Sequence, residues 1–389
     1  MLTDAPLDVS QDWKIAPSGE VRLRYERRVD KDFLDDANDN RSDLFWRFRP
    51  GVVLTGPKGV KITLQVQAFI NQFWTPGRNA STQGYDVFLA NVEMPVADGK
   101  LTLGRQRFGY FDQRLLGSRD WGNKGSSWDM VRFVGPKVDA FAGKLAVGRR
   151  GMKDQYLAAV VAKHGKSETS VVYKHDKLSG GDVNIGTLIH NGTLSKDKWT
   201  LGYEGAVQFG RSEGKDLLAW SGAVKATWAL SPRFKASGVL EVASGGSGES
   251  TTRLFDDLAY ANHDQMGITD MQGFRNVIHA GLTGEVTVNP QWRVVGRASH
   301  FWLYDKTDGW YDENGALNRR RGGFFIDPTG DSGRDLGTEV SIEAFYTPVK
   351  NQIWRFGCGV FLPGNFVKNM NDGTARNQFW LFAQYTYRF

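Results

Sequence analysis

Hydrophobic and polar residues alternate along much of this chain, most clearly at its C-terminal end. A period of two residues predicts an extended strand with one apolar face and one more polar face. In a soluble protein an aromatic strand at the end of a sheet favours aggregation, whereas in a closed outer-membrane barrel it pairs with the first strand and turns its apolar face to lipid. A buried strand of a soluble β-sandwich is the alternative. The apolar face of residues 377–389 holds Phe379, Leu381, Ala383, Tyr385, Tyr387 and Phe389.

The same alternation recurs often enough to predict an all-β chain of about eighteen strands. Bacterial single-chain barrels have an even number of strands. Because 154–163 and 166–175 alternate poorly, sixteen strands is the alternative count. The predicted strands are 18–30, 41–54, 59–74, 84–94, 99–109, 125–134, 137–148, 154–163, 166–175, 183–190, 197–210, 215–230, 232–243, 275–288, 290–304, 336–348, 351–362 and 377–389.

The connections between these strands alternate in length, although 149–153, 176–182, 191–196 and 211–214 blur the pattern. Tight turns with Pro or Asn, as at Asn289-Pro290, alternate with longer stretches such as 31–40, 75–83, 110–124, 244–274, 305–335 and 363–376. Outer-membrane barrels have short periplasmic turns and longer extracellular loops. We therefore predict a transmembrane antiparallel β-barrel with both termini in the periplasm. We expect one domain over residues 1–389, in which 1–17 form a short periplasmic segment.

Composition agrees with a barrel and excludes helical membrane proteins. The mean hydropathy is −0.42 and no apolar run approaches the ~18 residues of a transmembrane helix. The single cysteine, Cys358, excludes an internal disulfide. The N-terminus lacks the basic and apolar regions of a signal peptide, so we expect a mature chain preceded by an added initiator Met.

The apolar rows, such as Leu218, Trp220 and Trp228, are expected to face lipid, because Arg or Lys at the bilayer midplane costs about 2–4 kcal/mol. The polar rows then face the lumen, where basic residues outnumber acidic ones. Rings of Arg and Lys select anions; the alternative is that these charges pair across strands and make the barrel rigid. The predicted lumen lining includes Arg22, Arg24, Arg47, Arg49, Lys61, Arg275, Arg293, Arg297 and Arg355.

Two further arginines do not fit this simple pattern. Strict alternation places Arg105 and Arg107 on the same face as Leu101 and Leu103. A β-bulge at Gly104 would turn them inward. The alternative is that they lie above the apolar band.

Residues 101–133 carry a family resemblance. They contain a Gly-Arg-Gln strand, the sequence Asp-Gln-Arg-Leu-Leu-Gly, an Asp-Trp pair and a Trp-Asp strand. This segment resembles the signature of the alginate export family of bacterial outer-membrane porins. Residues 263–276, 301–311, 335–340 and 361–366 resemble the same family.

The resemblance implies a monomeric eighteen-strand barrel whose basic lumen passes an anionic polyuronate outward. We expect no cofactor, and a driving force supplied by concentration or by a periplasmic export partner. The resemblance also implies a pore constriction. Several arginines among acids in one loop fit that role, because the carboxylates orient guanidinium groups that would otherwise repel each other; an external loop with solvated charges is the alternative. The expected constriction residues are Arg105, Arg107, Arg114, Arg119, Asp112, Asp120 and Arg132.

Other chemistries have weaker support. The six histidines are scattered without metal-ligand spacing, and the aromatic residues alternate along strands and are not interleaved with the charges, so we expect neither a metal site nor a nucleic-acid partner. His263-Asp264 is the only local candidate for a hydrolase. We therefore expect a non-enzymatic channel for an anionic polysaccharide or uronate. A general anion-preferring diffusion porin is the first alternative, and an outer-membrane hydrolase the second.

Overall fold

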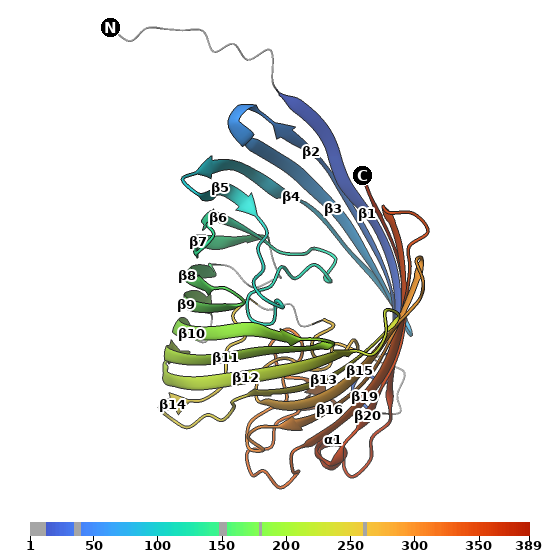
Figure 1. Cartoon of the computed structure of the whole chain (residues 1–389). Coiled ribbons are helices and arrows are strands. Elements are labelled where there is room, and N and C mark those ends of the chain that lie inside the picture. The colour runs from blue at the N-terminus through green and yellow to red at the C-terminus, as the bar shows by residue number, and fades with distance from the viewer. Residues whose placement is uncertain (1–12, 35–39, 148–153, 179–180, 260–262) are drawn as a thin grey trace, which may run out of the picture.

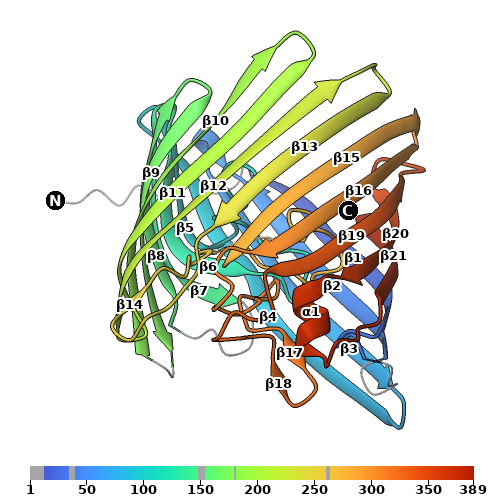
Figure 2. The same ribbon diagram turned by 90° about the horizontal axis from the view of Figure 1, so that it is seen from below.

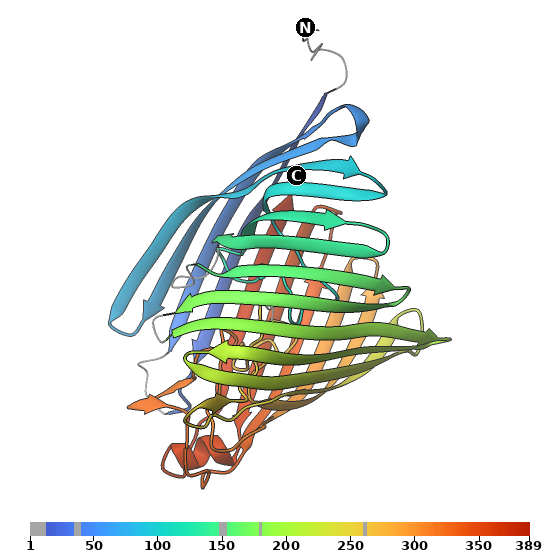
Figure 3. The same ribbon diagram turned by 90° about the vertical axis from the view of Figure 1, so that its left-hand side faces the viewer.

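The structure, a computed structural model, describes residues 13–34, 40–147, 154–178, 181–259 and 263–389. Within these residues, eighteen antiparallel strands pair in sequence order around a closed barrel (Figure 1). The strands are inclined to one another across the barrel (Figure 3). Because successive side chains of a strand point to opposite faces, alternate residues of this closed barrel face either the outside or the lumen.

The strands of the barrel wall have the following bounds. They are β1 (Lys14–Val29), β2 (Arg41–Thr55), β3 (Lys61–Thr75), β4 (Arg78–Val96), β5 (Gly99–Gln106), β6 (Ser127–Val134), β7 (Val138–Val147), β8 (Tyr156–His164), β9 (Ser167–Leu178), β10 (Gly181–Lys196), β11 (Trp199–Ser212), β12 (Lys215–Ala229), β13 (Phe234–Ala243), β15 (Val277–Asn289), β16 (Trp292–Leu303), β19 (Asp335–Tyr346), β20 (Gln352–Pro363) and β21 (Gln378–Arg388). The connections contain η1 (Pro57–Gly59), β14 (Thr251–Thr252), β17 (Arg319–Arg320), β18 (Gly323–Phe324) and α1 (Asn365–Met370).

The barrel closes where β21 pairs with β1. The pairing runs from Glu20 opposite Arg388 to Val29 opposite Phe379. Beyond it, Gly19 N–H donates to the Phe389 carbonyl at 2.7 Å. The first and last strands therefore have no exposed edge, which confirms the predicted closure. The start of β1 and the chain end lie at the same end of the barrel as the turn between β2 and β3.

All eighteen predicted strands are present, including β8 and β9, so the alternative of sixteen strands is wrong. Several boundaries differ. β1 begins at Lys14, four residues earlier than expected, and β4 begins at Arg78, so most of the predicted long connection 75–83 is strand joined by a tight turn. β10 extends to Lys196, and the predicted turn at 191–196 is therefore part of it. The predicted connection 149–153 lies outside the described residues.

The predicted outer face is confirmed by its aromatic residues. Trp220, Trp228 and Trp354 have exposed side chains on the outside of the barrel. Trp199 stacks on Trp228 with ring centroids 5.0 Å apart. No helix among the described residues is long and apolar enough to cross a membrane.

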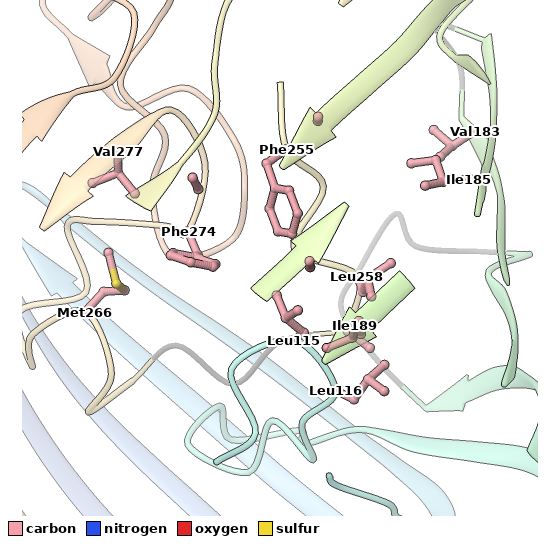
Figure 4. Close-up of a cluster of buried hydrophobic side chains, with 14 of the residues drawn as sticks. Leu115, Leu116, Val183, Ile185, Ile189, Phe255, Leu258, Met266, Phe274 and Val277 are labelled. Carbon is pink, nitrogen blue, oxygen red and sulfur yellow. The ribbon is translucent and has the colours of Figure 1, made fainter. Parts of the chain in front are cut away.

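The inner face differs from the expectation of polar rows all around the lumen. On β10, the inward residues Val183, Ile185 and Ile189 are buried and apolar. They belong to one hydrophobic cluster with Leu115, from the connection 107–126, and Leu258, from the connection 244–276 (Figure 4). The connections thus fill this side of the barrel with a packed core, and part of the inner face of its strands is apolar.

The long connections also pack together at one end of the barrel, where α1 lies (Figure 2). Phe33 stacks on Trp310 with ring centroids 5.8 Å apart, and both side chains are fully buried. Phe325 contacts Phe366 of α1 at 6.5 Å between ring centroids. Aromatic pairs of this kind add to the stabilisation that comes from burial, so this end of the barrel is covered by ordered chain.

Candidate functional site

The connection 107–126, which we call the inward loop, runs from β5 into the interior of the barrel (Figure 1). Its apolar residues Leu115 and Leu116 are buried in the hydrophobic cluster. Leu116 also forms a parallel bridge with Ala259 of the connection 244–276. Burial of its leucines therefore fixes one side of the loop and directs its polar side towards β1 and β2.

Asp120 is the centre of the polar side. Its carboxylate accepts hydrogen bonds from Arg49 at 2.8 Å and Arg47 at 3.1 Å, and Arg107 lies 3.5 Å away. Burial alone would raise the pKa of Asp120, but the surrounding guanidinium groups outweigh burial and hold this pKa below its ordinary value. Asp120 is therefore charged at neutral pH and binds the loop to β2.

The arginines of β1 hold the backbone of the same loop. Arg22 donates to the Asp120 carbonyl at 2.8 Å and to Asn123 Oδ1 at 3.2 Å, and Arg24 donates to the Trp121 carbonyl at 2.8 Å. These arginines alternate with outward residues on their strands and therefore meet the loop from one wall. We refer to Arg22, Arg24, Arg47 and Arg49 as the arginine clasp.

Trp121, next to Asp120, joins the inward loop to the connection 244–276. The ring of His263 stacks on Trp121 with centroids 3.6 Å apart and planes 8° apart. The Arg24 guanidinium lies 3.8 Å from the Trp121 ring centroid, within the range of a cation–π contact. His263 Nδ1 is 2.7 Å from Asp270 Oδ1, so the imidazole, proposed from sequence as part of a hydrolase, has a structural position here.

A cavity of about 530 Å³ lies beside this cluster, within the size range of ligand sites. It extends from Arg388, near the end of β21, to Glu313 in the connection between β16 and β19. The lining carries both charges and only a small basic excess. Its basic residues are Arg22, Arg47, Arg119, Lys124, Arg355 and Arg388, and its acidic residues are Glu20, Asp120, Asp264, Asp270 and Glu313.

Arg114 and Asp112 belong to a separate cluster, in which Arg114 is buried and Asp112 is partly exposed. Arg114 contacts Asp112 at 2.7 Å and Glu204 at 3.5 Å, and donates to Glu241. Burial lowers the pKa of Arg114, but Glu241, Asp112 and Glu204 outweigh it and raise this pKa above its ordinary value. With 2% of its surface exposed, Arg114 fixes the loop to β11 and β13 and does not line the cavity beside the clasp.

The expected bulge at Gly104 is wrong, and with it the inward position of Arg105. The pairings of β5 with β4 and β6 are continuous through Gly104. Arg105 lies on the outer face with Leu103, where Nε and Nη2 donate to the Asp129 carboxylate at 2.8 and 2.9 Å. Arg107, beyond the end of β5, does reach the lumen, because it contacts Asp120.

The remaining constriction residues, Arg119 and Arg132, lie apart from each other. Arg119 donates to Asn314 at 3.1 Å and lines the cavity. Arg132 lies 5.0 Å from the ring centroid of Tyr110, in the inward loop. The seven residues expected to form one constriction are therefore divided. Asp120 and Arg107 lie against the clasp, Arg119 lies at the cavity beside Asn314, Asp112 and Arg114 form their own cluster, Arg132 contacts Tyr110, and Arg105 is on the outer face.

Most of the other predicted lumen arginines are in ion pairs. Arg297 and Arg355 both contact Glu343, and Arg355 also contacts Asp264. Arg275 contacts Asp257 at 2.9 Å. The contacts with Glu343 join neighbouring strands and agree with the alternative reading of lumen charges as cross-strand pairs, whereas Arg275, Asp257 and Asp264 lie in the connection 244–276.

Two predicted lining residues lie towards the end of the barrel that carries the short turns. Arg293 contacts Glu285 at 2.9 Å, and its guanidinium lies 3.8 Å from the ring centroid of Phe345. Lys61 is exposed at the start of β3. Neither residue lines the cavity beside the clasp.

The sequence assigned no role to Trp121 and Asp270, and considered His263 and Asp264 only as a hydrolase candidate, although all four lie within the stretches 101–133 and 263–276 that resemble a known family. Their common feature is contact between the two connections. Such contacts have no periodicity, so alternation did not reveal them. Among the described residues, no group of three His, Cys, Asp or Glu side chains is placed to hold a metal ion.

Comparisons with known proteins agree with the architecture. A family model described as alginate export matches residues 139–381. Three solved Pseudomonas aeruginosa structures are similar. OccK5 (OpdH) is 12% identical, with 97% of this chain and 98% of that chain covered and a TM-score of 0.59. OccK7 (OpdD) is 14% identical, with coverages of 97% and 99% and a TM-score of 0.59, and the outer membrane protein OprD is 11% identical, with coverages of 96% and 94% and a TM-score of 0.58. At these identities the likeness shows the fold. No curated protein matches the chain.

Proposed function

Because the chain belongs to the alginate export family and is a bacterial outer-membrane channel, we propose that it conducts an anionic polysaccharide or a smaller uronate. We place both termini and the short turns in the periplasm, and we expect a monomer that secretes its solute outward and receives it at the end where Arg388 lies. A periplasmic export partner would deliver a polymer to this end. The observation that carries the proposal is the cavity bordered by the arginine clasp.

The clasp gives this cavity a positive wall that attracts a uronate carboxylate. Backbone carbonyls orient Arg22 and carry no net charge, so they leave its guanidinium charge in place, whereas Arg24 also contacts the Glu26 carboxylate at 2.7 Å. Low local dielectric strengthens the field of such charges. An anion is therefore attracted to the passage even though most of the clasp donors are already engaged.

Direct contacts with the solute are left to the cations with more exposed side chains. Arg388 is 61% exposed and lies 3.4 Å from Glu20, and Lys124 is 41% exposed. Arg119 lines the same cavity. Guanidinium groups bind carboxylates through their planar fork, and a series of weak sites of this kind allows a charged chain to enter and leave. We propose Arg107, Arg119 and Asp120 as the loop part of the constriction, with the buried Arg114 and its partner Asp112 as support.

A general anion-preferring diffusion porin is the second candidate. The cavity lining, with six basic and five acidic side chains, favours weak binding of many anions over tight binding of one polymer. Both candidates predict an anion preference. They differ in whether a uronate oligomer interrupts the current of small ions.

Planar-bilayer recording with a uronate oligomer separates the two. We expect interruptions at low oligomer concentration, none with a neutral oligosaccharide of equal length, and about tenfold weaker block in Arg388→Ala or Arg119→Ala, since one charge-assisted contact is worth about 1.5–3 kcal/mol. Arg105→Ala is the matched control because its guanidinium lies on the outer face. Absence of block in the wild-type channel would favour the diffusion porin.

A further inference from the structure

A hollow on the outside of the barrel lies across the closure between β1 and β21. It has a volume of about 420 Å³ and continues over β20 and β19. Its floor and sides are mainly apolar and outward-facing, with Ile342, Leu381 and Phe379 each about half exposed. The small side chain of Cys358, opposite both Ile342 and Leu381, leaves the depression between them.

One edge of this hollow is formed by Arg27. Arg27 pairs with Leu381 across the closure and therefore shares its outer face. Its Nη1 donates to Ser42 Oγ at 3.0 Å. Within the part of the chain that the structure describes, Arg27 has no carboxylate partner.

Arg105 shows how a paired arginine is accommodated on this outer face. Its guanidinium forms two hydrogen bonds with the Asp129 carboxylate, which cancels its charge. Arg27 has only a neutral hydroxyl, and an uncompensated charge facing lipid is costly unless it reaches the headgroup level. Arg27 lies two residues before the end of β1, at the end of the barrel that carries the long connections. At that level lipid headgroups supply anions.

We propose that the hollow binds a phosphate-bearing lipid of the outer leaflet, with its acyl chain over Cys358 and its phosphate against Arg27. The two parts of the site match the two parts of such a lipid. The apolar walls take up the chain, and the guanidinium fork at the edge binds the phosphate oxygens. The occupant is an integral lipid and not a free anion, because the guanidinium borders a largely apolar depression.

The single cysteine of the chain provides a probe inside the hollow. In detergent micelles we would measure the rate of Cys358 alkylation by a maleimide, with intact mass spectrometry as the readout. Three additions are compared: phosphatidylglycerol, diacylglycerol with the same chains, and inorganic phosphate. We expect phosphatidylglycerol to slow alkylation several-fold at a mole fraction where diacylglycerol has little effect, and inorganic phosphate to have none.

The variant Arg27→Gln should raise the phosphatidylglycerol concentration for half-protection by about tenfold. The matched control is Arg211→Gln, an exposed arginine at the same end of the barrel that contacts Asp216 and does not border the hollow; it should behave as wild type. Heat-modifiable mobility on gels confirms that both variants are folded. Equal protection by diacylglycerol, protection by phosphate alone, or unchanged protection in Arg27→Gln would each overturn the proposal.

Discussion

Replacement of Asp120 by Asn tests whether the arginine clasp both holds the inward loop and sets the charge of the passage. Asn keeps the shape of the side chain but removes the charge that Arg47, Arg49 and Arg107 contact at 3.1, 2.8 and 3.5 Å. Removal of one member of a buried ion pair costs about 3–5 kcal/mol. Because the Asp120 side chain is 26% exposed, solvent screening reduces this cost, and we expect about 2–3 kcal/mol.

The same change should increase anion preference. The cavity lining loses one negative charge while every guanidinium remains, so its net charge becomes more positive by one. At 0.1 M salt the Debye length is about 10 Å, so a charge inside the cavity acts on passing ions, and at 1 M it is about 3 Å and the effect largely disappears. We expect the chloride-to-potassium permeability ratio of Asp120→Asn to exceed that of the wild type at 0.1 M and to approach it at 1 M.

The assay combines reversal-potential measurements in bilayers with urea unfolding of the folded barrel. Asp129→Asn is the matched control, because it removes the same charge from the outer-face pair with Arg105 and should leave permeability unchanged. If Asp120→Asn and Asp129→Asn have the same permeability ratio and the same unfolding midpoint, the clasp neither sets the charge of the passage nor holds the loop.

Three further results are expected. Arg114→Ala should destabilise the barrel by about 3–5 kcal/mol, because it leaves the buried Glu241 carboxylate without its arginine. Urea unfolding measures this loss, and Arg105→Ala should reduce the free energy of unfolding much less. Burial, together with the negative charge of the adjacent Asp312, raises the pKa of Glu313 to about 7. This carboxyl lines the cavity and is neutral below that pH, so anion preference should be higher at pH 6 than at pH 8, and Glu313→Gln should flatten the difference. Trp121→Ala should remove the stack with His263 and increase open-channel current noise, recorded at constant voltage, while His164→Ala, at the short-turn end of β8, should not.

Strands were predictable because their signal is local. A period of two places the exposed Trp220 and Trp228 on the outside whatever the distant parts of the chain do. Inward positions were less predictable, since the lumen contains packed connections as well as water. Ile185 and Ile189 face inward against Leu115 and Leu258, and no pattern within β10 distinguishes an apolar residue that meets a loop from one that meets lipid.

The site was predictable only in part, for a related reason. Alternation placed Arg22 and Arg47 correctly on one wall, but their partners lie in the inward loop, about a hundred residues away from Arg22 in sequence. Arg105 shows the opposite error. Strict alternation correctly placed Arg105 on the outer face, and the expectation of a bulge at Gly104 wrongly turned it inward. A cross-strand carboxylate, Asp129, was the feature that made an outward arginine acceptable.

The clasp also changes how charge in this lumen is counted. Four guanidinium groups meet three carboxylates, from Glu20, Glu26 and Asp120, together with neutral backbone carbonyls. Carbonyls occupy hydrogen-bond donors without cancelling charge, so the wall keeps a positive field while losing most of its capacity to bind a carboxylate directly. We therefore assign the positive electric field and the direct binding of a carboxylate to different residues. We propose that the clasp attracts anions to the passage, and that cations with exposed side chains, such as Arg388, make the contacts by which the channel distinguishes a uronate from chloride.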